Sequence, residues 1–315
     1  MKKAIFWFRR DLRLEDNTAL FHGLNDYDVV IPVFIFDKNI LEKLPTSDKR
    51  VEFIWHCIQH IKNKLNAIGS DLIIIHDYPD QIIQLAKEHQ VDAVYCNEDY
   101  EPDAISRDQS VRDELSKNNI QFKAFKDTVI FAKKEILNQQ GQPYHVFTAY
   151  KNAWRAKLHS SNFSHYCSED LLVKMAKVES IQLISLENLG FEKTGIADKK
   201  IVGANHAHEL FAAFKADKVR QYKENREIPS ISGTSFLSTH FRFGTISTRK
   251  VVREILELSD VANGRYREGC DTWLNEIIWR DFYFQILFND PHVVHSSFKP
   301  QYKNFPWQTD ALLFN

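Results

Sequence analysis

Short apolar runs alternate with segments of helical periodicity along the first 125 residues of the chain. Five apolar runs predict buried strands, at 4–8, 29–36, 72–75, 93–96 and 122–125. Between them, apolar residues that recur every three or four positions predict a short helix capped by Asn17 and longer helices over 49–66, 81–89 and 102–117. Strands and helices that alternate at these lengths indicate an α/β fold with a parallel, doubly wound, Rossmann-like sheet.

The ligand crevice of such a sheet lies at the carboxyl ends of its strands. We therefore expect it among the loops at 9–16, 37–47 and 97–102. The first of these loops mixes arginines with acidic residues, a mixture that favours an ion-pair network over catalysis. The sequence contains neither a GxGxxG motif nor a Walker motif, so it offers no dinucleotide fingerprint and no P-loop.

The pattern changes after about residue 130, where strands give way to helices and polar connections. A helix is predicted from Phe147 to Trp154, and the irregular, polar residues 160–200 are typical of a linker with short helices. Amphipathic patterning predicts a further helix over 206–226. We expect three parts: an α/β domain over 1–130, an interdomain linker over 131–200 and a helical domain over 201–315.

Composition and charge narrow the class of protein. The 315 residues are 43% apolar and 26% charged, as in soluble globular proteins, and suffice for two domains. No apolar run is long enough to cross a membrane, and charge at Arg9 interrupts the apolar N-terminal stretch, unlike a signal peptide. The four cysteines are scattered without metal-ligand spacing, which predicts free thiols, no metal site and a cytoplasmic location. The formal net charge of −1 gives no global sign of nucleic-acid binding.

The stretch WLNEIIWRDFY, residues 273–283, combines aromatic and charged side chains. It contains no Pro or Gly and lies between Gly269 and the sequence Asn-Asp-Pro at 289–291, which predicts a helix bounded by these positions. Helical spacing places five of its side chains in one stripe: Trp273, Glu276, Trp279, Arg280 and Tyr283. Aromatic stripes are usually core, but buried charges need partners. We therefore expect a polar-aromatic cavity that suits a flat, hydrogen-bonding ligand such as a nucleobase.

A hydroxyl-rich turn lies within a basic segment upstream of this stretch. Residues 218–253 hold eight Lys and Arg residues against two acids, a net charge of +6, which predicts a local basic patch. The turn at 233–238 combines a glycine, three hydroxyls and successive backbone N–H groups, the chemistry of an anion-binding nest. A plain helix N-cap explains the same residues equally well, while the flanking positive charge favours phosphate binding.

Several motifs resemble the photolyase/cryptochrome family, in which an α/β domain precedes a helical flavin domain. They are WFRRDLRLEDNTAL from Trp7, GQPYHVFTAYKNAW from Gly141, a TSxLSxxxxxGxIS pattern from Thr234, and WLNEIIWRDFY from Trp273. By matching positions, the resemblance implies FAD contacts at Tyr222, Thr234, Ser235, Phe236, Leu237, Ser238 and Trp273, with Phe236 at a position that varies in the family. It also implies that five side chains face damaged DNA: Arg226, Glu276, Trp279, Arg280 and Tyr283.

The resemblance is closest to photolyases that act on cyclobutane pyrimidine dimers, and it implies light-driven repair of UV-damaged DNA. Reduced FAD would pass an electron to the flipped dimer, in a carbon–carbon lyase reaction that needs no nucleophile and no metal. Trp279 would stack on a base, worth about 1–3 kcal/mol, Glu276 would bond the pyrimidine edge and assist catalysis, and Arg226 and Arg280 would hold phosphates. Trp307 matches the surface end of the family's electron-transfer chain. The expected partner is damaged DNA, and the protein is expected to be a monomer away from membranes.

Two other functions stay open: a cryptochrome-type blue-light photoreceptor and a non-catalytic nucleotide-binding module. A (6-4) photolyase is less favoured because Glu276 and Trp279 suit the pyrimidine-dimer pocket.

The second chromophore also stays open between folate, deazaflavin and flavin types, or none. The positions that hold folate in the family correspond to Leu44, Asp103 and Ala104, which lack two of the expected side chains. The family's later flavin-binding motifs do not occur before Asn315. We therefore expect a fragment or truncated product that binds FAD weakly or not at all and repairs little.

Overall fold

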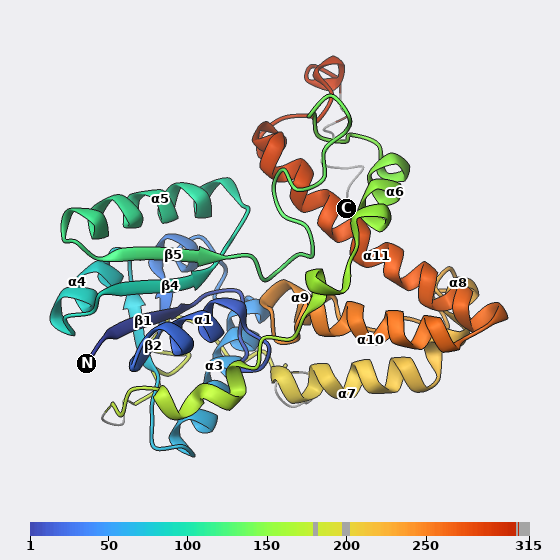
Figure 1. Ribbon diagram of the computed structural model, residues 1–315. Helices are drawn as coiled ribbons and strands as arrows, with labels where there is room; N and C mark the ends of the chain where they lie inside the picture. The colour runs from blue at the N-terminus through green and yellow to red at the C-terminus, as the bar shows by residue number, and fades with distance from the viewer. Residues whose placement is uncertain (179–181, 197–201, 307, 309–315) are drawn as a thin grey trace.

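The computed structural model describes residues 1–178, 182–196, 202–306 and 308, and it joins an α/β part to a layer of helices (Figure 1). Five parallel strands form one sheet in the order β3-β2-β1-β4-β5. They are β1 (Lys3–Phe8), β2 (Val29–Asp37), β3 (Ile73–Asp77), β4 (Ala93–Asn97) and β5 (Gln121–Phe125). The predicted fold class, a doubly wound sheet followed by helices, is confirmed.

Helices cover both faces of the sheet, which explains why its strands are continuous apolar runs. Side chains of β1 alternate between the two faces, with Phe6 and Phe8 in one core and Ile5 and Trp7 in the other. The first core includes residues of α1 (Thr18–Asp26) and α3 (Lys49–Asn66), and the second includes residues of α4 (Gln81–Glu88) and α5 (Pro102–Lys117). Asn17 caps α1 as predicted, with its side chain accepting from the Leu20 N–H.

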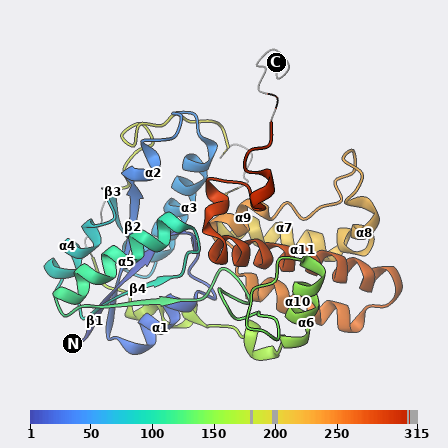
Figure 2. The ribbon, with the colours of Figure 1, turned by 90° about the horizontal axis from the view of Figure 1, so that it is seen from above.

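The second part of the chain is helical. It contains α6 (Phe147–Lys157), α7 (Gly203–Ala216), α8 (Tyr222–Asn225), α9 (Ser238–Phe243), α10 (Thr248–Val261) and α11 (Gly264–Asn289). Helices α7, α10 and α11 lie side by side, and both views show α6 against α11 (Figures 1 and 2). Short 3-10 turns connect these helices, at Ser160–Phe163, Ser168–Lys174, Lys218–Gln221, Pro291–Val294 and Pro300–Tyr302. No helix in the described parts of the chain is long and apolar enough to span a membrane.

The prediction of one continuous helix over 206–226 is wrong, because α7 ends at Ala216. Asp217 leaves the helical region with φ −130° and ψ −59°, and a 3-10 turn and α8 follow. Residues after the break, such as Val219, are fully buried in the core that α7 joins. The spacing of apolar residues therefore continues past the end of α7, and the spacing alone cannot reveal that the helix breaks there.

The helix around 273–283 is longer than predicted at its N-terminal end. It passes through Gly269, which lies so close to Val219 that a Cβ there would overlap the carbonyl oxygen. This glycine permits a close contact instead of ending the helix. The predicted C-terminal end is confirmed, because Asp290 caps α11 and Pro291 follows.

Four buried charged side chains join the α/β part to the helices, and we call them the interdomain quartet: Arg13, Asp16, Asp127 and Arg249. Nη2 of Arg13 lies 2.7 Å from Oδ2 of Asp127. Nη2 of Arg249, on α10, lies 2.9 Å from Oδ1 of Asp127 and 3.0 Å from Oδ1 of Asp16. None of the four side chains is more than 5% exposed. The ion-pair network expected after β1 is therefore present, and it includes partners from distant segments.

The quartet lies at the crevice that the sheet topology creates between β1 and β4, where the strand order reverses. The Leu12 N–H donates to the Phe243 carbonyl at 3.0 Å. Gly244 has a φ of +62°, and a Cβ there would overlap the carbonyl of Arg10. The turn between α9 and α10 thus fills the crevice in which a ligand was expected, and the space for a ligand is displaced to one side.

We expect Asp127→Asn to lower the free energy of unfolding by about 3–5 kcal/mol, because it leaves two guanidiniums buried without their shared carboxylate. Burial alone would raise the pKa of Asp127, but Arg13 and Arg249 hold it below its ordinary value. Its contribution is therefore present above about pH 4 and is lost as the pH falls further. Urea unfolding at pH 7 measures the change. Glu114→Gln, which breaks an exposed pair with Lys117 on α5, is the control and should change little. Equal effects of the two variants would contradict the importance of the quartet.

Candidate functional site

A cavity of about 410 Å³ lies beside the filled crevice, between α8, α9, α11 and the loop after β1. It brings together six residues that the sequence assigns to the site: Tyr222, Ser235, Ser238, Trp273, Glu276 and Arg280. Five further residues complete its lining: Arg10, Phe241, Arg242, Ile277 and Phe284. The lining therefore joins hydroxyls, aromatic rings and three guanidiniums from segments far apart in the sequence.

The predicted stripe on α11 divides between two faces of the helix. The cavity face carries Trp273, Ile277, Arg280 and Phe284, at steps of four, three and four residues, together with Glu276. Trp279, although it belongs to the predicted stripe, is not among the cavity residues.

Trp279 instead belongs to a series of stacked rings. The ring of Phe147, the first residue of α6, lies 3.5 Å from the Trp279 ring at an interplanar angle of 6°. Tyr283 follows at 5.5 Å and 22° on the same helix, and it is 63% exposed. The structure thus brings Trp279 and Tyr283 together, but outside the cavity.

Trp273 belongs to the core and to the cavity wall at once. It is 3% exposed and packs against Phe211, Phe214 and Phe241. Both interpretations of the aromatic stripe therefore hold at this position, because one edge of a buried indole also faces the cavity.

The turn at 233–238 presents its serines to the cavity. Ser235 and Ser238 line it, whereas Thr234 and Leu237 do not, and Leu237 is buried in the helical core. Phe236 has a φ of +57° and points to the surface, where Lys218 lies over its ring. No side-chain hydroxyl caps α9. The simple capping explanation for this turn is therefore wrong.

The electrostatics of the cavity are set by paired and unpaired charges. Glu276 at the rim accepts from Arg226, which also lies 2.9 Å from Glu227. Burial raises the pKa of Tyr222, so its phenol stays protonated at neutral pH. Arg280 donates to the carbonyls of Thr128, at 2.5 Å, and Phe241, at 3.2 Å.

Arg280 has no ion-pair partner among the described residues, although Asp281 lies near enough to favour its charge. Burial lowers its pKa to about 10, so it stays positive at neutral pH. No carboxylate in the described segments forms an ion pair with it, although it lines the cavity. A half-buried cation of this kind makes the cavity suited to an anionic ligand.

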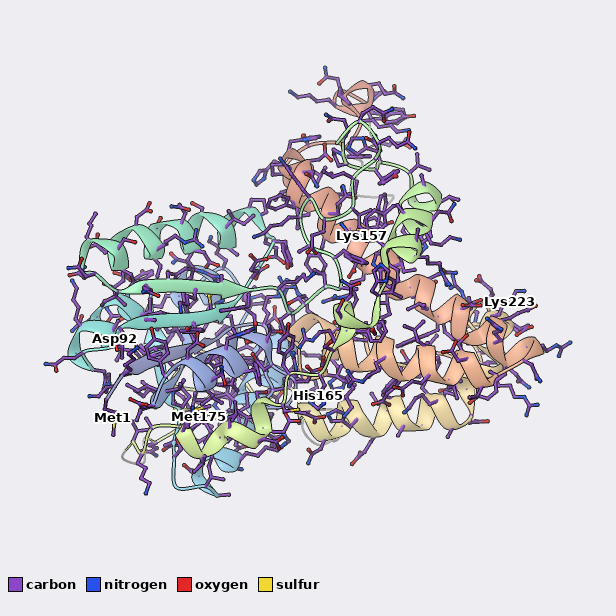
Figure 3. The ribbon with its side chains drawn as sticks, viewed as in Figure 1. Met1, Asp92, Lys157, His165, Met175 and Lys223 are labelled. Carbon is purple, nitrogen blue, oxygen red and sulfur yellow. The ribbon has the colours of Figure 1, made fainter. Side chains whose placement is uncertain are left out.

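The basic segment at 218–253 does not form the free patch that its net charge predicts. Five of its eight cations pair with carboxylates: Lys223 with Glu268, Arg226 with Glu276, Arg242 with Glu101, Arg249 with Asp16 and Lys250 with Glu15. Figure 3 shows that Lys223 lies at the outer end of the helical layer, away from the sheet. Acids from other parts of the fold neutralise the segment.

Several cavity residues were missed in the sequence. Ile277 and Phe284 continue the helical spacing of Trp273 and Arg280, so periodicity could have found them. Arg10 and Arg242 come from different parts of the fold, and no local signal connects them.

Trp307 lies outside the described residues. The positions compared with a folate site are spread over α5 and the loop after β2, with Asp103 exposed and Ala104 buried. Cys57, Cys96, Cys167 and Cys270 are free thiols, and no group of potential metal ligands occurs among the described residues.

Family models match both parts of the chain. The model of DNA photolyase matches residues 4–168, and that of the FAD binding domain of DNA photolyase matches residues 273–314. Deoxyribodipyrimidine photo-lyases of Synechococcus sp. and Halobacterium salinarum are 29% and 30% identical over 98% and 97% of this chain. Cryptochrome-2 of Arabidopsis thaliana is 29% identical over 98% of the chain and 52% of its own length. The chain spans 65% and 66% of the two photo-lyases.

Solved structures share the same architecture. A bacterial class III photolyase from Agrobacterium tumefaciens superposes with a TM-score of 0.86 at 24% identity, over 100% of this chain and 64% of its own. An archaeal photolyase from Sulfolobus tokodaii, solved with two FAD molecules, gives 0.71 at 27% identity, over 99% of this chain and 65% of its own.

Gly269→Ala should lower the free energy of unfolding by about 1–3 kcal/mol, because its Cβ would push the backbone of Val219 away from α11. The same displacement would move α8 and Tyr222. Gly23→Ala in α1 is the matched control, since its Cβ would meet Tyr95 at an ordinary 3.5 Å. That change should be neutral or stabilising by up to about 1 kcal/mol. Urea unfolding of both variants checks the prediction, and a stabilised Gly269→Ala would contradict it.

Proposed function

We propose, from the premise that the chain belongs to the DNA photolyase family, that its cavity forms part of an FAD site that serves light-driven repair of cyclobutane pyrimidine dimers. The observation that carries this proposal is the composition of the cavity. Two serines, a buried indole and a half-buried guanidinium without a paired carboxylate among the described residues line one space. Such a set suits a ligand that is both aromatic and anionic, as a flavin dinucleotide is.

The cavity residues fit the chemical groups of FAD. Ser235 and Ser238 can donate to phosphate oxygens, and Arg280 can balance their charge. Trp273 offers an apolar edge to the flavin ring, and the protonated phenol of Tyr222 adds a hydrogen-bond donor. When bound in its reduced form, FAD would supply the electron that splits the dimer. The cavity of about 410 Å³ lies within the range of ligand sites.

The face of α11 next to the cavity supports the DNA side of the proposal. Trp279 and Tyr283 present stacked rings there, and Tyr283 is exposed. The pair of Arg226 and Glu276 lies at the rim, where the carboxylate can accept from a pyrimidine edge and the guanidinium can bind a phosphate. A flipped nucleotide needs such a platform beside the cofactor.

A photoreceptor of the cryptochrome type is the second candidate. Phe147 lies on the ring of Trp279 and so covers the face on which a base would stack. A photoreceptor would need the cavity for its flavin, but it would not need the Trp279 ring to be free for stacking with a base. Repair of dimer-containing oligonucleotides under blue light separates the two functions, since the photoreceptor should give none.

We expect the double variant Ser235→Ala/Ser238→Ala to bind FAD about ten-fold or more weakly, because each lost hydrogen bond to a phosphate is worth about 1 kcal/mol. Fluorescence titration of the whole chain with FAD, extended to millimolar concentrations, measures the affinities. Ser232→Ala removes a hydroxyl of the same segment outside the cavity, and it should leave the affinity unchanged. Equal affinities of the double variant and the unmodified chain would overturn the FAD assignment.

Trp279→Ala should weaken binding of dimer-containing DNA by about 1–3 kcal/mol, the value of one stacked base. Trp279→Phe keeps a ring and should retain most of the affinity. Fluorescence anisotropy with matched damaged and undamaged oligonucleotides measures both variants. If Trp279→Ala binds the damaged oligonucleotide as tightly as the unmodified chain does, Trp279 is not the platform.

A further inference from the structure

Two arginines from different parts of the fold meet one carboxylate at the mouth of the cavity. Arg10 lies in the loop after β1, and Arg242 lies on α9. Nη1 of each is 2.7 Å from Oε1 of Glu101, the residue that precedes α5. Both arginines line the cavity, and we call them the mouth arginines.

This contact differs from the interdomain quartet in its access to water. The side chain of Arg242 is 50% exposed and that of Glu101 is 40% exposed, whereas no side chain of the quartet exceeds 5%. Exposed ion pairs contribute little to stability. Glu101 can therefore exchange with another anion at little cost, which the buried carboxylates of the quartet cannot do.

Arg10 keeps its position without Glu101. Its Nη1 also lies 3.1 Å from Asp99, and its Nε donates to the carbonyl of Arg242 at 3.3 Å. The two guanidiniums are thus held close enough to share one oxygen atom. Guanidinium matches phosphate in geometry as well as it matches carboxylate, and a phosphate can offer a separate anionic oxygen to each of the two arginines that now share Oε1 of Glu101.

We infer that the mouth arginines bind a backbone phosphate of a nucleic-acid strand, and that Glu101 occupies this phosphate site until the strand arrives. The choice of nucleic acid rests on the proposed function. A strand that inserts one nucleotide into a cavity must place the neighbouring phosphates at its mouth. The half-exposed Arg242 lies at that mouth, whereas the serines and the less exposed Arg280 line the rest of the cavity.

The source of the phosphate has one alternative, the diphosphate of a bound dinucleotide. The two sources predict different responses to the loss of Glu101. A strand phosphate makes DNA binding sensitive to salt through the mouth arginines. A dinucleotide phosphate would instead change the affinity for FAD and leave DNA binding unaltered.

Glu101→Gln in the full chain should bind an undamaged oligonucleotide about three- to ten-fold more tightly, with a plot of log affinity against log salt steeper by about one. Arg242→Ala should make that slope shallower by about one, and in the double variant it should abolish the gain from Glu101→Gln. Glu114→Gln is the matched control, because it changes charge equally on an exposed part of α5. Fluorescence anisotropy across a salt series gives the slopes of the unmodified chain and the four variants, and circular dichroism checks the fold.

Three results would overturn the inference. Equal gains in Glu101→Gln and Glu114→Gln would show an effect of net charge alone. A gain that survives Arg242→Ala would exclude the mouth arginines. A change in FAD affinity with unchanged DNA slopes would assign the site to the dinucleotide. Undamaged DNA keeps the test separate from the proposed function, whose failure would appear instead as equal binding of damaged and undamaged DNA.

Discussion

The arrangement of the molecule depends on the requirement that buried charges be paired. Arg13 pairs with Asp127 within the α/β part, and Arg249 completes the network with Asp16 and Asp127 only when the start of α10 lies against the loop after β1. This one contact fixes how the helices meet the sheet. It also fills the crevice that a doubly wound sheet ordinarily offers to a ligand, so that the cavity opens beside it, against α11.

α11 forms a wall of the cavity in this position. Gly269 lets the helix approach the backbone of Val219, and this approach brings α8 and Tyr222 to one end of the cavity. Further along, Trp273 and Arg280 face the cavity while Asp281 faces the other way, accepting from the N–H groups of Ile130 and Phe131. One helix thus anchors the start of the connecting segment and supplies the wall of the site.

The sequence predicted the fold well where a local period was sufficient. Residues 49–66 form a helix with the predicted ends, and the continuous apolar runs form strands buried on both faces. The sequence did not predict the features that depend on a contact with a distant segment of the chain. Gly269 looks the same in sequence whether it ends a helix or permits a contact. The stripe from Trp273 to Tyr283 was split because Trp279 packs its ring on Phe147 of α6, a contact that the local pattern does not reveal. The basic segment was neutralised by acids such as Glu101 and Glu15.

The stack of Phe147 on Trp279 has an energetic consequence for any base that binds there. A pair of aromatic side chains gains about 0.5–1.5 kcal/mol beyond area burial, and a base stacked on an aromatic side chain gains about 1–3 kcal/mol. A base that stacks on the same face must displace Phe147, so the loss of the Phe147 pair offsets part of what the base gains. Trp279 can therefore be held in one orientation by its own chain without being withheld from a ligand. Because Phe147 is the first residue of α6, a base that displaces Phe147 from Trp279 would also shift the start of α6.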